Sequence, residues 1–311
     1  MTVETRDFKT IFEKIDFYEN HPLSEYTYTK VGGNAEVLFL PKCIEELRII
    51  RKYATEHEIP MTVLGNASNL IIRDGGIKGF VVLLEKMNDI TVNDKKVTAF
   101  AGAKLIEASE IAREVSLSGL EFASGIPGSI GGAIYMNAGA YGGEIADVFE
   151  DCQVMLKDGR LEVWTKEMMH FGYRSSALQA GGVICVSATL ALTYGDIIEI
   201  SQKMEELDEK RRLRQPLEYP SCGSVFKRPE GYFTGKLIQD TGLQGRIIGG
   251  AQVSTKHAGF IVNIGGASAC DYEQLIALII AEVQAKFGVT LQPEVRIIGE
   301  KISCDELQAD S

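Results

Sequence analysis

The feature that most limits how this chain can fold is a glycine-rich segment from Gly119 to Gly143, in which eight of 25 residues are glycine. Glycine destabilises a helix or strand by roughly 0.5–1 kcal/mol relative to alanine, so this density must be offset by something else. Either the main chain lies against a flat ligand, with Ser129 and Asn137 as hydrogen-bonding partners, or a glycine-rich helix packs closely on a sheet. We favour the ligand.

A second run of small residues, Gly65 to Leu70, directly follows the short apolar stretch 61–64. Such a turn can direct successive backbone N–H groups at a phosphate. It is neither the G-x-G-x-x-G fingerprint of a Rossmann fold nor a P-loop, because no Gly-Lys-Ser/Thr follows. Taken alone, this run favours an ordinary tight turn.

Hydrophobic periodicity divides the chain into alternating helices and strands. It predicts a hairpin across Asp158-Gly159, a helix over 104–118 that ends at a left-handed Gly119, and a long helix over 197–214 that ends before Pro216. Asp271 and Gln274 resemble the capping box of a helix over 271–287. We therefore expect an α+β protein with an N-terminal extension, two subdomains and a final domain, at residues 1–27, 28–100, 101–200 and 201–311.

Composition excludes several classes of protein. The net charge of -11 disfavours binding to nucleic acid or anionic membranes. The chain has neither an N-terminal signal pattern nor an apolar run of about 18 residues, so we expect a cytoplasmic protein without membrane insertion. Its six cysteines lack the spacing of a zinc site or a disulfide scaffold, so we expect reduced thiols and no metal. No obligate protein partner is indicated.

One segment departs from this acidic background. Between Lys210 and Arg246 there are eight basic residues and three acidic ones. The excess fits either a phosphate-bearing ligand or a solvated helix end, and the sequence does not decide between them.

Five separated strings carry a resemblance to a known family. Strings at 65–70, 119–144, 173–176, 222–227 and 293–296 occur in the same order in the UDP-N-acetylenolpyruvoylglucosamine reductase (MurB) family, over roughly residues 28–299. The chain resembles the shorter form of that family, which lacks an inserted tyrosine-bearing loop. The resemblance implies an FAD-binding module of the PCMH type, similar to vanillyl-alcohol oxidase, in two α+β subdomains, followed by a substrate domain.

The resemblance also implies the chemistry. NADPH reduces a non-covalently bound FAD, which then reduces UDP-N-acetylglucosamine enolpyruvate to UDP-N-acetylmuramate for peptidoglycan synthesis. Ser224 matches the family's proton donor, Arg174 the residue that holds the substrate carboxylate, and Glu294 the acid beside it. Each has an ordinary alternative: a strand-end serine bonded to backbone, or ion pairs such as Glu294 with Arg296. Cys222 has no indicated histidine partner, so we interpret it as a small buried residue.

The remaining site residues follow from the same match. Those expected to contact FAD are Gly65, Asn66, Ala67, Ser68, Asn69, Leu70, Gly125, Ile126, Pro127, Gly128, Ser129, Gly131, Gly132, Asn137, Ala138, Gly139 and Arg296. Those expected to bind the UDP-sugar are Arg214, Lys227, Arg228 and Lys236. The family commonly has glycine where Ala67 stands, which leaves the detail of this turn open.

Two other functions compete with this one. An oxidase of the same FAD-binding superfamily would use oxygen and often tethers flavin through histidine, but no histidine lies in the two cofactor segments. A nucleotide-sugar-binding regulator would need no proton donor, so the presence of Arg174, Ser224 and Glu294 together disfavours it.

Overall fold

The computed structural model describes residues 8–304, which form two compact units. Of these described residues, unit 1 comprises 8–19, 37–66 and 79–211, and unit 2 comprises 20–36, 67–78 and 212–304. Each unit has a hydrophobic core of its own. Among the described residues, no helix is long and apolar enough to cross a membrane.

The first sheet has four strands in the order β1-β2-β5-β3. These are β1 (Asp16–Pro22), β2 (Asn34–Leu40), β5 (Ile77–Leu83) and β3 (Met61–Leu64). Strand β3 runs parallel to β5. Phe8 of α1 (Phe8–Ile11) and the adjacent Phe12 pack edge to face against Phe80 of β5. On the helix α2 (Ile44–Glu56), Leu47, Ile50 and Ala54 are buried at helical spacing.

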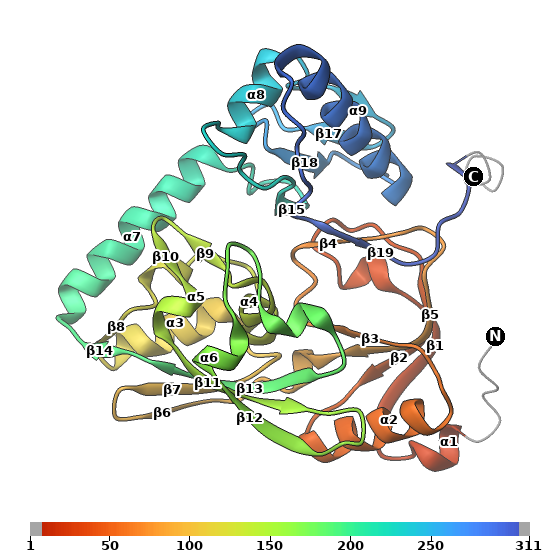
Figure 1. Ribbon diagram of the computed structural model, residues 1–311, viewed down its shortest axis with the longest axis vertical. Coiled ribbons are helices and arrows are strands. Elements are labelled where there is room, and N and C mark those ends of the chain that lie inside the picture. Colours follow the sequence, from red (N-terminus) through yellow and green to blue (C-terminus); the bar gives the residue numbers. More distant parts are fainter. Residues whose placement is uncertain (1–7, 305–311) are drawn as a thin grey trace. The chain divides into compact units, whose positions relative to one another are not determined.

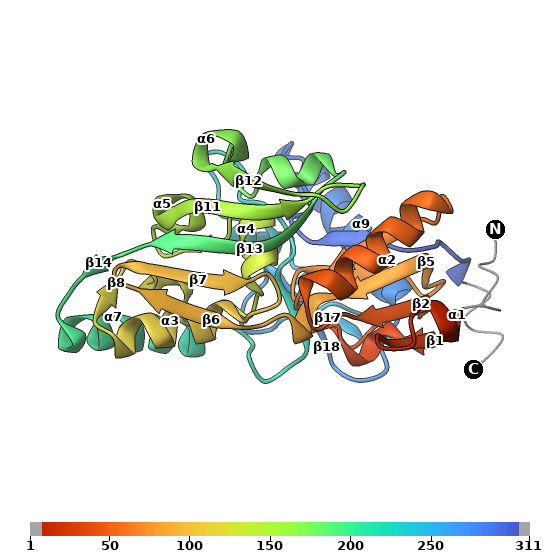
Figure 2. The ribbon, with the colours of Figure 1, turned by 90° about the horizontal axis from the view of Figure 1, so that it is seen from below.

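A five-stranded antiparallel sheet forms the rest of the unit 1 framework, in the order β12-β11-β13-β7-β6 (Figure 2). In chain order its strands are β6 (Ile90–Asn93), β7 (Lys96–Phe100), β11 (Phe149–Met155), β12 (Leu161–Thr165) and β13 (Ile184–Ala191). The hairpin β11-β12 turns at Asp158-Gly159, where Gly159 has a φ of 82°, and this confirms the prediction.

Helices and short elements fill the connections of unit 1. Its helices are α3 (Leu105–Glu114), α4 (Ile130–Met136), α5 (Ile145–Val148) and α6 (Lys166–Met169). Its 3₁₀ turns are η2 (Leu84–Lys86), η3 (Glu121–Ala123) and η4 (Ala177–Ala180). Two small ribbons, β8-β14 and β9-β10, pair Leu117–Ser118 with Thr193–Tyr194 and Gly139–Ala140 with Gly143–Glu144.

Unit 2 packs its longest helix, α9 (Ala269–Phe287), against β16 and β17 of an antiparallel sheet ordered β15-β18-β17-β16 (Figure 1). In chain order these strands are β15 (Ser221–Ser224), β16 (Ile247–Ile248), β17 (Ala251–Val253) and β18 (Phe260–Asn263). A parallel pair joins β4 (Leu70–Ile72) to β19 (Arg296–Ile298). The unit also contains η1 (Leu23–Glu25) and α8 (Thr234–Asp240).

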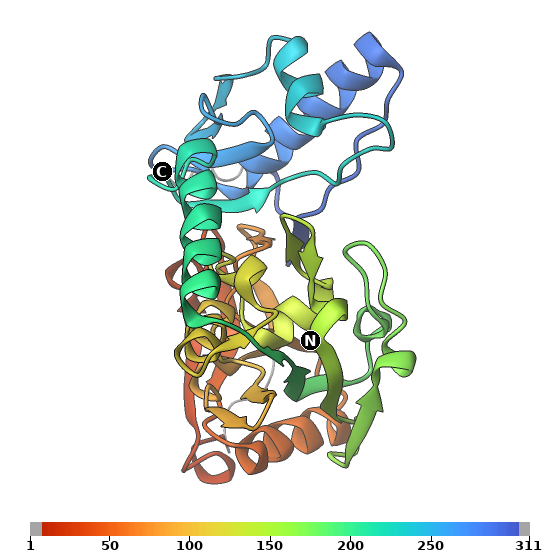
Figure 3. The same cartoon turned by 90° about the vertical axis from the view of Figure 1, so that its left-hand side faces the viewer.

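Helix α7 spans Ile197–Arg214 as one continuous helix, as predicted (Figure 3). Two predicted helix ends were wrong. Helix α3 ends at Glu114 and a left-handed Ser116 follows, so Gly119, with φ 131°, lies beyond β8 and does not cap the helix. Helix α9 begins at Ala269, two residues earlier than expected, because Ser268 is its N-cap and forms the capping box with Asp271.

The expectation that all cysteines are reduced was wrong for one pair. Cys270, in the first turn of α9, forms a disulfide with Cys304 near the end of the described chain. A separation of 34 residues along the chain gave no sequence signal for this pairing. Cys43, Cys152, Cys185 and Cys222 are free thiols.

Candidate functional site

Within unit 1, Gly65 and Asn66, the first residues of one expected cofactor segment, lie against the other, the Gly119–Gly143 segment. The amide nitrogen of the Asn66 side chain donates to the carbonyl of Pro127 at 2.9 Å. A Cβ placed on Gly65 would lie 2.1 Å from Ser129 Oγ, so only glycine allows the turn after β3 to approach the start of α4 this closely. Ser129 in turn caps α4 by accepting from Gly132 N at 3.2 Å.

Most glycines of the Gly119–Gly143 segment are explained by contacts within the protein. Added Cβ atoms would meet Arg211 at Gly125, Ala101 at Gly131 and the ring of Phe122 at Gly143, all at 2.5–2.9 Å. The alternative of a glycine-containing helix packed on a sheet is therefore correct for Gly131, whose helix α4 packs on β7 and β13. The expectation that the whole segment serves a ligand was too broad.

Bare main chain remains at two of these glycines. A Cβ on Gly132 would meet only Ser129 Oγ, at 3.3 Å, and one on Gly142 would meet nothing within 4 Å. Gly132 lies next to the junction of the two small-residue segments. The residues there thus fit a flat, phosphate-bearing group such as FAD, because small side chains leave backbone exposed where the segments converge.

Asn137 is fully buried and ends α4 in the left-handed conformation, with φ 42°. Its side-chain nitrogen donates to Gly172 O at 3.0 Å and its side-chain oxygen accepts from Ala146 N at 2.9 Å. These bonds connect α4 to the turn that carries Arg174. Asn137 therefore orders the surroundings of another predicted site residue.

Arg174 has a left-handed backbone with φ 53°, in a tight turn closed by two hydrogen bonds between Gly172 and Ser175. Its Nη2 donates to Gly139 O at 2.9 Å, and its guanidinium lies 5.3 Å from the ring centre of Tyr173. A left-handed conformation is uncommon for a residue with a long side chain, and strained backbones of this kind cluster at functional sites. Arg174 thus lies beside the end of the glycine-rich segment.

Within unit 2, Ala67 is also left-handed, with φ 45°, and is buried. This conformation costs an L-residue roughly 1–2 kcal/mol and costs glycine almost nothing. The structure thus gives a physical reason for a glycine at this position and shows that the chain accepts alanine there.

The residues that follow Ala67 meet the strand that carries Arg296. Leu70 pairs with Arg296 in the parallel ladder β4-β19, and Arg296 N donates to Asn69 O at 3.1 Å. Asn69 Nδ2 donates to Glu294 O at 3.2 Å. One loop thus holds the backbone of two predicted site residues.

Ser224 ends β15 beside Phe260 of β18, and its Oγ donates to Phe226 O at 3.4 Å. The carbonyl of the next residue, Val225, accepts from Glu294 N at 2.7 Å and from Val295 N at 3.2 Å. Ser224 and Glu294 therefore lie in adjoining segments of the chain, and both are half-buried. Sequence distance hides this relationship, because 69 residues lie between them.

Two residues near Ser224 in unit 2 have pKa values shifted by burial. Burial raises the pKa of the Cys222 thiol to about 12, so it stays protonated and is no nucleophile, as interpreted from the sequence. Burial lowers the pKa of His257. His257 Nδ1 accepts from Gly259 N at 3.1 Å, and a Cβ on Gly259 would lie 3.0 Å from the His257 ring and 3.6 Å from Ser224 Oγ. Sequence reasoning missed this proximity.

The expected substrate-binding cations lie in unit 2. Lys227 is half-buried, and Arg214, Arg228 and Lys236 are exposed. Arg228 lies 4.0 Å from the ring centre of Phe233, and Lys236 pairs with Asp240 at 2.5 Å.

Arg211, from the same basic segment, differs: it belongs to unit 1 and is buried. Its helical spacing from buried Ile200, Met204 and Leu207 is the signal that sequence reasoning missed.

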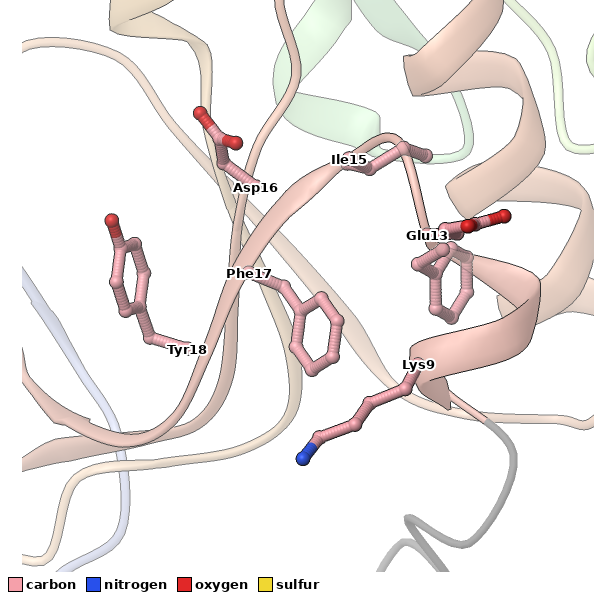
Figure 4. A pocket seen from close by; sticks show the side chains of 7 residues that line it. Lys9, Glu13, Ile15, Asp16, Phe17 and Tyr18 are labelled. Atoms are coloured by element: carbon pink, nitrogen blue, oxygen red, sulfur yellow. The ribbon is translucent and has the colours of Figure 1, made fainter.

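A surface pocket in unit 1 lies apart from all of these residues (Figure 4). Its lining residues are Lys9, Phe12, Glu13, Ile15, Asp16, Phe17 and Tyr18. Asp16 accepts a hydrogen bond from Lys86 at 2.7 Å, and this lysine together with Lys42 lowers the pKa of Asp16.

In the described part of the chain, no group of three or more His, Cys, Asp or Glu side chains is arranged to hold a metal ion.

Comparison with known proteins identifies two domains in this chain. A family model described as an FAD binding domain matches residues 35–164. A second, for the C-terminal domain of UDP-N-acetylenolpyruvoylglucosamine reductase, matches residues 215–298. The expected α+β architecture of an FAD-binding module followed by a C-terminal domain is confirmed.

Individual relatives extend the match to almost the whole chain. A UDP-N-acetylenolpyruvoylglucosamine reductase of Streptococcus uberis is 54% identical over 94% of this chain and 96% of its own length. One of Pediococcus pentosaceus is 52% identical over 93% of this chain and 97% of its own. The crystal structure of the Thermus caldophilus enzyme (MurB) has a TM-score of 0.78 at 36% identity, covering 91% of this chain and 98% of that one. The chain therefore belongs to the UDP-N-acetylenolpyruvoylglucosamine reductase family.

Proposed function

We propose that this chain carries out its family's reaction with Arg174, Ser224 and Glu294 at the reacting centre. As a member of the family it is an FAD-dependent oxidoreductase, a UDP-N-acetylmuramate dehydrogenase. It reduces UDP-N-acetylglucosamine enolpyruvate to UDP-N-acetylmuramate with NADPH as co-substrate, in peptidoglycan precursor synthesis.

The observation that carries the proposal is the fixed relation between Ser224 and Glu294. Two backbone bonds to Val225 O and the Asn69 side chain hold the chain at Glu294 beside the end of β15. A proton donor and a carboxyl group on neighbouring segments of the chain are what a site needs if it must deliver a proton to carbon beside a developing enolate.

FAD, when bound, supplies the hydride that reduces the vinyl carbon of the substrate. The protein must then stabilise negative charge on the adjoining carboxylate and protonate the neighbouring carbon. In the proposal, Arg174 binds the carboxylate through its planar guanidinium, and Ser224 Oγ donates the proton. Glu294 is the acid beside them. The left-handed turn at Arg174, closed on both sides by Gly172 and Ser175, supports a fixed placement of that guanidinium.

The proposed FAD-binding residues fall into two groups. In unit 1, Gly65, Asn66 and the segment from Gly125 to Gly139 would offer main chain and small polar groups. In unit 2, residues 67–70 and Arg296 would do so, supported by the ladder between β4 and β19. No histidine lies in either group, which favours non-covalent binding.

The UDP-sugar would be held by Arg214, Lys227, Arg228 and Lys236, whose charges suit a diphosphate. Residues 201–311 would form the substrate domain, in keeping with the family model at 215–298. A cytoplasmic location, and the lack of nucleic-acid, membrane and obligate protein partners, remain part of the proposal.

An anaerobic flavin titration tests the function. We expect the purified protein to be yellow, NADPH to bleach it, and UDP-N-acetylglucosamine enolpyruvate to restore the colour with formation of UDP-N-acetylmuramate. UDP-N-acetylglucosamine, which lacks the enolpyruvyl group, is the matched control and should leave the protein bleached. A protein that only oxygen re-oxidises would be an oxidase, and one that takes up no FAD would contradict the proposal.

A further inference from the structure

Arg211 is the only charged side chain that is buried among the residues the structure describes, with 4% of its surface exposed. Burying a guanidinium is unfavourable unless its donors are satisfied. Its place in α7, on the same face as Ile200 and Leu207, turns it into the interior of unit 1.

The Nη1 and Nη2 atoms of Arg211 donate hydrogen bonds to one short stretch of chain and one carboxylate. Nη2 donates to Phe122 O at 2.5 Å, and Nη1 donates to Ser124 Oγ at 3.2 Å and to Asp208 Oδ1 at 2.9 Å. Ser124 Oγ also donates to Asp208 Oδ1, at 2.8 Å. The three side chains form a closed triangle that fixes residues 122–124 to α7.

The residue after this stretch is Gly125, where the expected cofactor segment starts. A Cβ there would lie 2.5 Å from Arg211 Nη1 and 2.6 Å from its Cδ, so the backbone of Gly125 lies directly against the arginine. The next turn is short, with Ile126 N bonded to Ala123 O and Gly128 N to Ile126 O. The position of Ser124 therefore sets where Pro127 and Gly128 lie.

Arg211 also reaches the other end of the glycine-rich segment. Its guanidinium lies 5.1 Å from the ring centre of Tyr141, a residue with a left-handed φ of 54°. One side chain thus contacts both the chain that enters α4 and the turn that follows it.

We propose that Arg211 is a positioning residue for FAD binding: it sets the geometry of the Gly125–Gly132 loop without touching the cofactor itself. The inference rests on the proposed function, because it assumes that this loop contacts FAD. Since both Nη atoms already have protein acceptors, the arginine acts through the loop.

The test measures FAD binding to apoprotein by flavin fluorescence and, separately, the thermal unfolding of the same apoprotein. Arg211→Lys keeps the charge but loses the fork that bridges Phe122 O and Ser124, and we expect the FAD dissociation constant to rise about tenfold or more. Ser124→Ala opens the triangle more gently, with an expected rise of about three- to tenfold. Arg160→Lys is the matched control, because Arg160 also pairs with an aspartate in unit 1 but is 73% exposed. Its FAD affinity should equal that of the wild type.

Gly132→Leu separates this inference from the proposed function, because it places a side chain directly on the bare main chain. If Gly132→Leu weakens FAD binding while Arg211→Lys and Ser124→Ala bind FAD like the wild type, the inference fails and the loop assignment stands. If none of the three changes FAD affinity, the loop assignment fails and takes the inference with it. Lower unfolding temperatures with unchanged FAD affinity would likewise overturn the inference, because Arg211 would then serve stability alone.

Discussion

The main-chain amide of Glu294 donates to the carbonyl of Val225 at 2.7 Å, which attaches Glu294 to the residue that follows Ser224. The bond depends on backbone atoms alone. Either side chain can therefore be changed without loss of the bond that aligns them, and chemical roles can be tested separately from folding.

Glu294→Gln should lower kcat by about 10²-fold or more, because an amide cannot give up a proton to the enolate. The unfolding temperature should change little, since the amide keeps the size of the side chain and the backbone bonds to Val225 and Asn69 remain. Steady-state kinetics and thermal unfolding measure the two effects. Glu300→Gln, in the same unit, is the control and should leave kcat unchanged; an equal loss in both variants would remove the special role of Glu294.

Ala67→Gly should stabilise the protein by about 1 kcal/mol, because glycine relieves the left-handed backbone at φ 45° and this gain exceeds its extra unfolded-state entropy. Urea unfolding of the apoprotein measures it. Ala54→Gly, within α2, should instead destabilise by about 1 kcal/mol or more. A loss of stability in Ala67→Gly would show that the strain at this turn is absent.

His257 should make stability depend on pH. Burial lowers its pKa below that of the unfolded chain, about 6.5, so the unfolded state binds a proton at a pH where the folded state does not. Stability is fully present above that value and is lost as pH falls through 6.5 toward the lower folded pKa. Urea unfolding at pH 7.5 and 5.5 should show a smaller decrease for His257→Gln than for the wild type. Equal decreases would mean that this histidine titrates normally.

The disulfide between Cys270 and Cys304 should leave four titratable thiols in the unfolded, unreduced protein and six after reduction. Cys304→Ser should lower the free energy of unfolding by about 2–4 kcal/mol under oxidising conditions, because the bond closes a 34-residue loop. Under reducing conditions the variant and the wild type should be alike. Six thiols before reduction would show that the pair is not bonded.

The sequence carries local features of this fold well. The hairpin at Asp158-Gly159 and the helix over 197–214 follow from turn chemistry and periodicity, which depend on neighbouring residues. The family strings also placed Gly65 and Ser129 in one cofactor site, and the structure brings these two residues together.

The site features that could not be predicted from the sequence depend on contacts between residues far apart in the chain. Charge alone left open whether the basic segment binds a ligand or forms a solvated helix end, whereas Arg211 in that segment is buried and bonded to Ser124, 87 residues away. Glycine density suggested a single cause, whereas Gly131 and Gly143 are required by Ala101 and Phe122. The left-handed backbone of Arg174 has no local signature, since it is imposed by the turn that Gly172 and Ser175 close.

Separating the two half-reactions in Ser224→Ala tests the central claim most directly. Stopped-flow absorbance should show NADPH reducing the bound flavin within about twofold of the wild-type rate, while re-oxidation by UDP-N-acetylglucosamine enolpyruvate slows by about 10²–10⁴-fold. Ser221→Ala, the same change in the same strand, should leave both rates unaltered. Re-oxidation by substrate at a near wild-type rate in Ser224→Ala would contradict the assignment of Ser224 as proton donor.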